Sequence, residues 1–307
     1  MGSSGSVAGP SSVLLGAASL DIYLGRDLVL PGGGVLNMAW HLRDEVDPWL
    51  LLTRVGDDRP EVFLDFLGRH GIPHAAGSIV GHGPSASIDI VIQPDLQPFM
   101  DNFVEGVWAT YRSTPAEEAL VAGARRLHLV LVEGAIRELD RLHAAGLTEC
   151  LEVTADFLGF RHYTVERFAG TMRAVDVGFV GWPGALDDPV VAGLRRVAHD
   201  LARLVVVTLG SRGVQVFDGR PGGEDRFVPV LPVTVRGTTV GCGDAFVAAF
   251  LAAWRRSPDV VAAIEAGKAS GSEATAWRRP LPDEAYGPRA VEALRAADAE
   301  AVNPARP

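Results

Sequence analysis

The fold is decided by the stretch Thr239–Leu251, which reads TVGCGDAFVAAFL. Two glycines flank a cysteine, an aspartate follows, and an apolar helical pattern begins at once. Glycine lets the backbone approach a ligand closely and adopt angles that other residues avoid. The free N–H groups at a helix start, aided by the helix dipole, bind anions. The stretch therefore predicts a phosphate-binding turn at the start of a helix.

Asp244 is an unusual neighbour for a phosphate, because the two negative charges repel each other. Its position is explained if the carboxylate takes a proton from a hydroxyl that attacks the phosphate. The alternative is an ordinary glycine-rich turn, with Asp244 as a first-turn acid that complements the helix dipole. The stretch alone leaves both readings open.

Four further motifs occur in a fixed order along the chain. They are an apolar strand with Gly16 and Asp21 at its end, GGGVLNMA at 32–39, RVGDD at 54–58 before a helix that ends in HGIP at 70–73, and VVVTLGSRG at 205–213. Together with Gly241–Asp244, which is similar to a Gly-Ala-Gly-Asp element, they resemble the PfkB/ribokinase family of sugar and nucleoside kinases. The resemblance covers roughly residues 13–288. Further segments, including 99–107 and 154–157, resemble the fructoselysine 6-kinase subgroup.

The resemblance implies a set of site residues. Asp244 is the expected general base, and the N–H groups of Gly241, Cys242 and Gly243 are expected to stabilise charge on the transferred phosphoryl group. The residues expected to bind substrate are Asp21, Gly33, Asn37, Asp101, Asn102 and Glu105, and those expected to bind nucleotide are Thr208, Gly210 and Gly213.

Each assignment has a structural alternative. Asp21 could cap a turn, Asn37 could bond the local backbone, and Ser211–Gly213 could form a simple strand-to-hairpin turn. Asp101, Asn102 and Glu105 could simply form a polar edge that binds no substrate. Asp57 and Asp58 are read as caps of a helix that begins at Pro60.

Apolar strand-like runs alternate with helical patterns, which predicts a mainly parallel sheet with helices on both faces. We expect a ribokinase-like α/β domain over 13–297, with tails at 1–12 and 298–307 that are disordered. The segments 21–30 and 85–107 break the alternation and predict a small β-sheet. In the resembled family such a sheet covers the sugar and often forms a dimer contact.

The composition of the 307 residues excludes several classes of protein. A net charge of -10 argues against a nucleic-acid or anionic-membrane binder. The two cysteines indicate neither a disulfide scaffold nor a zinc site, and a reducing cytoplasm fits them best. No run of apolar residues is long enough to span a membrane, and residues 1–12 do not read as a signal peptide.

Two positions depart from the family pattern. Thr238 replaces the aspartate that helps to form a monovalent-cation site in several members, which puts potassium activation in doubt. The family's magnesium motif Asn-x-x-Glu is replaced by GWPG at 181–184. Asp187 and Asp188 lie close behind and could substitute for it through water or cap a helix, so the metal ligands stay unknown.

The sequence thus favours a kinase that uses ATP and Mg²⁺ to phosphorylate a hydroxyl of a fructosamine or related amino sugar, with Asp244 as base. A ribokinase-like or nucleoside kinase is the second reading. The third is a sugar- or nucleotide-binding regulator that has lost turnover. A homodimer formed through the lid is a further expectation.

Overall fold

The computed structural model describes residues 10–25, 28–160 and 163–288. Most of the two expected tails, and the C-terminal boundary expected at 297, lie outside these residues. Among the described residues, no helix combines the length and the apolar character needed to cross a membrane.

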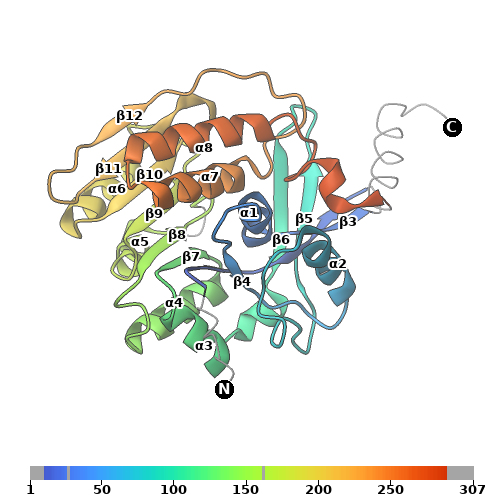
Figure 1. Ribbon diagram of the computed structural model, residues 1–307. Coiled ribbons are helices and arrows are strands. Elements are labelled where there is room, and N and C mark those ends of the chain that lie inside the picture. Colours follow the sequence, from blue (N-terminus) through green and yellow to red (C-terminus); the bar gives the residue numbers. More distant parts are fainter. Residues whose placement is uncertain (1–9, 26–27, 161–162, 289–307) are drawn as a thin grey trace.

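The larger of two sheets has eight strands in the order β12-β11-β10-β9-β8-β7-β1-β4 (Figure 1). Neighbouring strands from β10 to β4 in this order pair in parallel. Strand β11 pairs antiparallel with β10, and β12 pairs antiparallel with β11. The strands are β1 (Ser12–Leu15), β4 (Leu50–Leu52), β7 (Arg126–Val130), β8 (Glu152–Asp156), β9 (Val177–Gly181), β10 (Leu204–Thr208), β11 (Val214–Asp218) and β12 (Arg226–Val228).

Helices cover both faces of this sheet, as predicted. One face carries α1 (Gly34–Leu42), α7 (Cys242–Arg256) and α8 (Val260–Ala274), and the other carries α3 (Pro115–Ala122), α4 (Glu133–Ala144), α5 (Val165–Met172) and α6 (Pro189–Asp200). Successive residues of a strand point to opposite faces of the sheet. Leu14 therefore packs against the first group of helices, and Val13 and Leu15 pack against the second.

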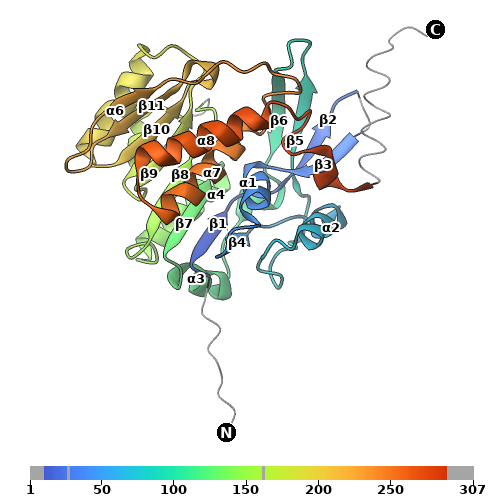
Figure 2. The same ribbon diagram turned by 45° about the horizontal axis from the view of Figure 1, so that its top comes forward.

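The smaller sheet has the strand order β3-β2-β5-β6. It consists of β2 (Ser19–Tyr23), β3 (Leu28–Gly32), β5 (Ala86–Ile92) and β6 (Pro98–Val104), and it stands beside α2 (Pro60–His70). Helix α1 lies between the two sheets (Figures 1 and 2). The prediction of a mainly parallel sheet with a separate small sheet is confirmed, and the small sheet is called the lid below.

Two local predictions were wrong. The apolar alternation over residues 227–235 predicts an antiparallel edge strand, but β12 ends at Val228. Pro229 and Pro232 follow it, and proline cannot donate to a sheet ladder. Asp57 and Asp58 do not occupy the cap position of α2, which is Arg59; the side chain of Arg59 makes no capping hydrogen bond, and its backbone N–H donates to Asp58 at 3.0 Å. They instead accept hydrogen bonds from residues 82–85, the loop that leads into the lid.

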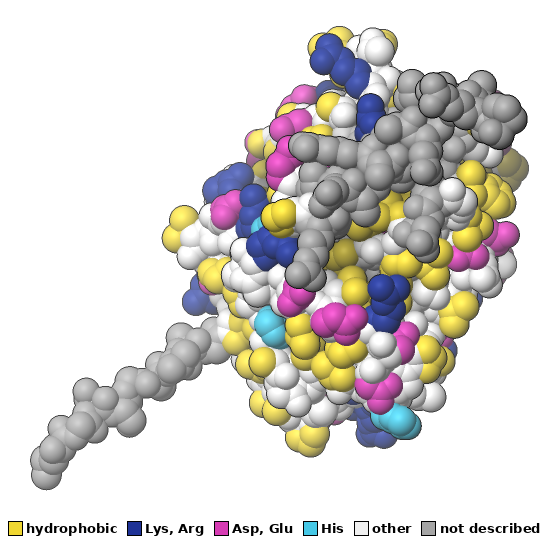
Figure 3. Space-filling model, turned by 90° about the vertical axis from the view of Figure 1, so that its right-hand side faces the viewer, with side chains coloured by type: hydrophobic (Ala, Val, Ile, Leu, Met, Phe, Trp, Pro, Cys, Tyr) yellow, Lys and Arg dark blue, Asp and Glu magenta, His cyan; other side chains and the backbone are white. Residues whose placement is uncertain are grey.

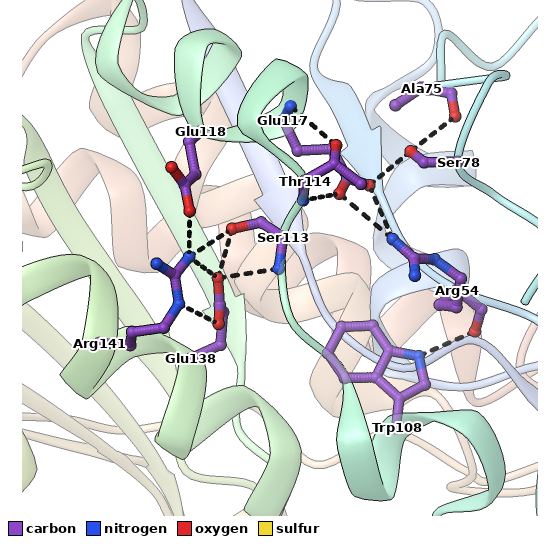
Figure 4. Close-up of polar contacts among 10 residues, drawn as sticks. All are labelled: Arg54, Ala75, Ser78, Trp108, Ser113, Thr114, Glu117, Glu118, Glu138 and Arg141. Atoms are coloured by element: carbon purple, nitrogen blue, oxygen red, sulfur yellow. Dashed lines mark hydrogen bonds and ion pairs between the residues drawn. The ribbon is translucent and has the colours of Figure 1, made fainter.

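Buried acids beneath the large sheet are each paired with an arginine (Figure 4). Glu117, in α3, receives a hydrogen bond at 3.2 Å from Arg54, and Glu138, in α4, receives one at 2.6 Å from Arg141. Trp108 donates its indole N–H to the carbonyl of Arg54 at 2.9 Å. Because these charges are compensated within the protein, the cluster ties α3 and α4 to the loop after β4 and has a structural role.

Figure 3 shows the charged and apolar side chains on one face of the molecule. There the Lys and Arg side chains of the described residues are scattered among acidic and apolar ones and form no continuous basic surface.

Candidate active site

The glycine-rich turn starts α7 as predicted. Gly241 occupies the cap position with a φ of 78°, and a Cβ on it would lie 2.5 Å from the backbone of Pro280, so glycine is required twice over. The backbone N–H of Cys242 already donates to the carbonyl of Thr239 at 3.3 Å, so it is less available to a ligand. Among the described residues the amides of Gly243 and Asp244 have no acceptor, so the turn retains free donors for an anion.

Asp244 lies where α7 meets the first turn of α1. Its Oδ2 accepts a hydrogen bond from Nδ2 of Asn37 at 2.7 Å, and its Oδ1 would lie 3.0 Å from a Cβ on Gly34. Burial raises the pKa of Asp244 to about 6, although the bond from Asn37 acts in the opposite direction. A carboxylate with a pKa near neutrality is well matched to general-base catalysis.

The other expected substrate residues of this region converge on the same point. Asp21, at 4% exposure, accepts from Ser19 Oγ at 3.0 Å and packs against Gly32, where a Cβ would lie 2.1 Å from the carboxylate. Burial and the charge of Asp244 raise the pKa of Asp21 to about 7. Gly33 has a φ of 90° and would place a Cβ 2.6 Å from the carbonyl of Ala17, so no other residue fits there.

Asn37 carries a second sign of a binding site. It is 3% exposed, and its Oδ1 has no hydrogen-bond partner among the described residues. An unsatisfied buried acceptor is costly. A ligand hydroxyl that donates to this oxygen would remove the cost.

Sequence reasoning did not single out Asp156, which the structure adds to the site. It ends β8 and is 7% exposed; its Oδ1 accepts from the amide of Leu158 at 2.8 Å. Burial and the charge of Asp244 raise the pKa of Asp156 to about 7. The sequence signal that could have identified Asp156 is its position as an acid at the carboxyl end of a central strand, because ligands bind at this edge of a parallel sheet.

The expected nucleotide residues lie at the same edge of the sheet. Thr208 ends β10, and its carbonyl accepts from the amide of Trp182, which follows β9, at 2.9 Å. Gly210 and Gly213 bound a short 3₁₀ turn with φ values of 61° and 140°. Arg212 donates to the carbonyl of Pro183 at 2.9 Å, so the loops after β9 and β10 are tied together.

The structure does not bring the three lid residues to Asp21. Asp21 pairs with Ile88, whereas Asp101 pairs with the next residue, Asp89. Paired residues share a face of a sheet and consecutive residues alternate, so Asp101 lies on the face opposite to Asp21. The register therefore separates Asp101 from Asp21, and binding of substrate by Asp101 stays a prediction.

The other two lid residues are engaged within the protein. Asn102 adopts a φ of 49° and donates to Asp89 at 3.1 Å. Glu105 accepts from the amide of Gly134 at 2.8 Å, at the start of α4, and lies 3.5 Å from Arg137. Both side chains therefore stabilise the lid and its base.

The tip of the lid reaches the segment that precedes the glycine-rich turn. Thr238, fully buried, donates to the carbonyl of Leu96 at 3.0 Å, and Thr239 donates to Oε1 of Gln97 at 2.8 Å. Thr238, which departs from the family pattern, thus holds the hairpin between β5 and β6 beside the glycine-rich turn.

The arrangement defines the class of fold: a ribokinase-like α/β fold in which the carboxylate of Asp244 and the glycine-rich start of α7 lie beside a small β-sheet. Residues 179–277 match the family "pfkB family carbohydrate kinase". Together with the relatives below, this match confirms the resemblance to the PfkB/ribokinase kinases, and the chain is a phosphotransferase that acts on an alcohol group.

Individual relatives agree with this assignment. Fructoselysine 6-kinase of Escherichia coli (strain K12) is 25% identical over 84% of this chain and 95% of its own. Cytidine kinase of Thermococcus kodakarensis is 26% identical over 83% of this chain and 92% of its own. The solved structure of ribokinase from Giardia lamblia superposes with a TM-score of 0.70 at 17% identity, over 93% of this chain and 99% of its own, and shows the shared fold.

Proposed function

We propose that this protein transfers the γ-phosphate of ATP to a hydroxyl of a fructosamine or a similar amino sugar, with Asp244 as the general base. The observation that carries the proposal is the 2.7 Å hydrogen bond between Asn37 and Asp244. It joins the substrate-side motif of α1 to the carboxylate at the start of α7, so that a hydroxyl bound by the first is within reach of the second.

Each group in the site has a role in this reaction. Asp244 accepts the proton of the attacking hydroxyl, and Asn37 orients its carboxylate. Asp21 and the unpaired Oδ1 of Asn37 bind other hydroxyls, while the backbone at Gly33 allows the sugar to approach closely. The free amides at the start of α7 stabilise charge that develops on the transferred phosphoryl group.

The loops after β9 and β10 receive the nucleotide, with Thr208, Gly210 and Gly213 beside its phosphates and adenosine. When bound with the nucleotide, Mg²⁺ would neutralise negative charge on its phosphates. Among the described residues no group of three or more His, Cys, Asp or Glu side chains is close enough to hold a metal directly. The acids present fit a hydrated ion, which keeps several of its waters in most proteins.

The similarity to fructoselysine 6-kinase over most of the chain favours an amino sugar as substrate. A nucleoside kinase is the second candidate, because cytidine kinase is equally similar over nearly the same length. The lost Asn-x-x-Glu motif favours a third reading, a regulator that binds ligand without turnover, and the retained Asp244 opposes it.

The decisive test measures ADP release with Mg²⁺ and ATP against fructosamines, ketohexoses, ribose and nucleosides. The Asp244→Asn variant is measured in parallel. We expect turnover with fructosamines, lowered by several orders of magnitude in the variant. Preference for a nucleoside would replace the first proposal by the second. Sugar or nucleotide binding without any turnover would establish the regulator.

We also propose that the lid forms a homodimer contact. Its edge strand β6 exposes Phe99, Phe103 and Val104, at 49%, 41% and 45%, and an exposed apolar edge strand favours pairing with another chain. Analytical ultracentrifugation of the parent and of Phe103→Lys tests this, because a lid contact predicts a dimer that dissociates in the variant.

A further inference from the structure

The buried acids of the described chain fall into two groups. Outside the site, Glu117, Glu138 and Asp218 each form an ion pair with an arginine, at 3.2, 2.6 and 2.7 Å. Within the site, Asp21 and Asp156 have no Arg or Lys partner among the described residues, and neither has Asp244, which they face. Buried charges are ordinarily paired. Among the described residues the site therefore has no basic side chain to compensate these carboxylates when they are ionised, and a bound cation would do so.

Asp156 is held so that one oxygen remains available. Its Oδ1 is bound by the amide of Leu158, whereas its Oδ2 has no donor among the described residues. The neighbouring strand residue is Val130, which pairs with Asp156. A Cβ on Gly34 would lie 3.2 Å from Cγ1 of Val130 and 3.0 Å from Oδ1 of Asp244. Asp156 and Asp244 thus lie on two sides of the same small region of the sheet edge.

The acids that follow β9 are directed elsewhere. Asp188 accepts the indole N–H of Trp182 at 3.0 Å and does not cap α6 with its side chain. It lines, with Val191 and Phe217, a groove of about 220 Å³ between α6 and β11. Asp188 is therefore engaged with Trp182, and Asp187 lines the same groove.

A second observation, independent of the acids, indicates that a ligand completes this site. The Oδ1 of Asn37 is buried and unpaired, while the Nδ2 of the same amide is bonded to Asp244. The cluster is therefore a site that lacks hydrogen-bond donors as well as positive charge.

From these observations we infer that Asp156, together with Asp244, holds the water shell of the Mg²⁺ that accompanies the nucleotide, in place of the missing Asn-x-x-Glu motif. A hydrated cation supplies both the charge and the O–H donors that the two carboxylates lack, and Mg²⁺ gives up its waters reluctantly. The inference rests on the proposed use of ATP, and it is independent of which sugar is phosphorylated.

The test is calorimetric titration of the full chain with a non-hydrolysable ATP analogue over a range of Mg²⁺ concentrations. For Asp156→Asn we expect affinity without Mg²⁺ to change less than about twofold, and the half-saturating Mg²⁺ concentration to rise about 10–100-fold, as when residues that orient a metal's ligands are lost. Asp188→Asn is the matched control and should leave both quantities unchanged. Asp156→Ser provides a second variant if the first does not fold.

An unchanged Mg²⁺ requirement in the Asp156 variants would overturn the inference, and a raised KM for the sugar in the same variants would make Asp156 a substrate ligand instead. Nucleotide binding by the parent that does not depend on Mg²⁺ would also overturn it. If the parent shows the expected Mg²⁺ dependence but phosphorylates no fructosamine, the proposed substrate fails while this inference stands.

Discussion

Replacing Asn37 by leucine tests the central contact of the site. The change keeps the approximate volume of a side chain that is 3% exposed and removes the donor 2.7 Å from Asp244. A hydrogen bond to a charged group contributes about 1.5–3 kcal/mol. Since this bond stabilises the ionised form of Asp244, its loss raises the pKa of that carboxyl from about 6 by about 1–2. The acidic limb of the kcat/KM profile should move upward by the same amount.

The assay is ADP release between pH 5 and pH 9, because kcat/KM reports ionisation of the free enzyme. Ser19→Ala is the control, since Ser19 donates to Asp21 and not to Asp244. A limb that moves only in Asn37→Leu belongs to Asp244. A limb that moves only in Ser19→Ala belongs to Asp21 and would refute the assignment of the base, and a limb that moves in neither variant would refute the contact.

Three further outcomes are expected. Burial raises the pKa of Asp156 to about 7, so its protonation stabilises the fold at low pH, and this contribution is lost as pH rises through 7. Thermal unfolding should therefore show that Asp156→Asn is more stable than the parent at pH 8, by up to about 4 kcal/mol. The gain in stability should be smaller at pH 5. Thr239→Val removes the bond to Gln97 at the lid tip and should raise the sugar KM about fivefold with little change in kcat; an unchanged KM would show that this contact does not hold the lid over substrate. Iodoacetamide at pH 8 should label the exposed Cys150 and spare Cys242, whose pKa burial and the charge of Asp244 raise to about 12; peptide mass mapping that found both labelled equally would contradict this.

The sequence was sufficient for the parts of the site that depend on local pattern. The turn at Gly241, the helix that follows it and the pairing of apolar strands with helices could all be predicted, because glycine, small residues and apolar periodicity act over a few neighbours. The assignment of Asp21 and Asn37 needed the ordered resemblance as well, since each alone has an ordinary local explanation.

The parts that could not be predicted depend on partners that are distant in the chain. Asp57 and Asp58 precede a helix that begins with proline, as caps do, but the loop at Ser85 provides donors that hold them away from it. The carboxylate of Asp101 could bind a polar substrate, but the pairing register of β5 and β6 determines which face of the lid it lies on. Asp156 reads as a simple strand end until Asp244 is placed beside it.

The run Gly32–Gly34 explains why the substrate-side motif needs glycine at three successive positions. A Cβ at 32 would meet the carboxylate of Asp21, one at 33 would meet the carbonyl of Ala17, and one at 34 would meet the carboxylate of Asp244. The run is therefore the stretch of backbone between Asp21, which we propose binds hydroxyls, and Asp244, which we propose removes a proton. Because glycine has no side chain, the distance between the two carboxylates is set by the backbone of this run alone. The position of the hydroxyl that reacts should accordingly follow from the backbone, while the lid determines which substituents the rest of the substrate carries.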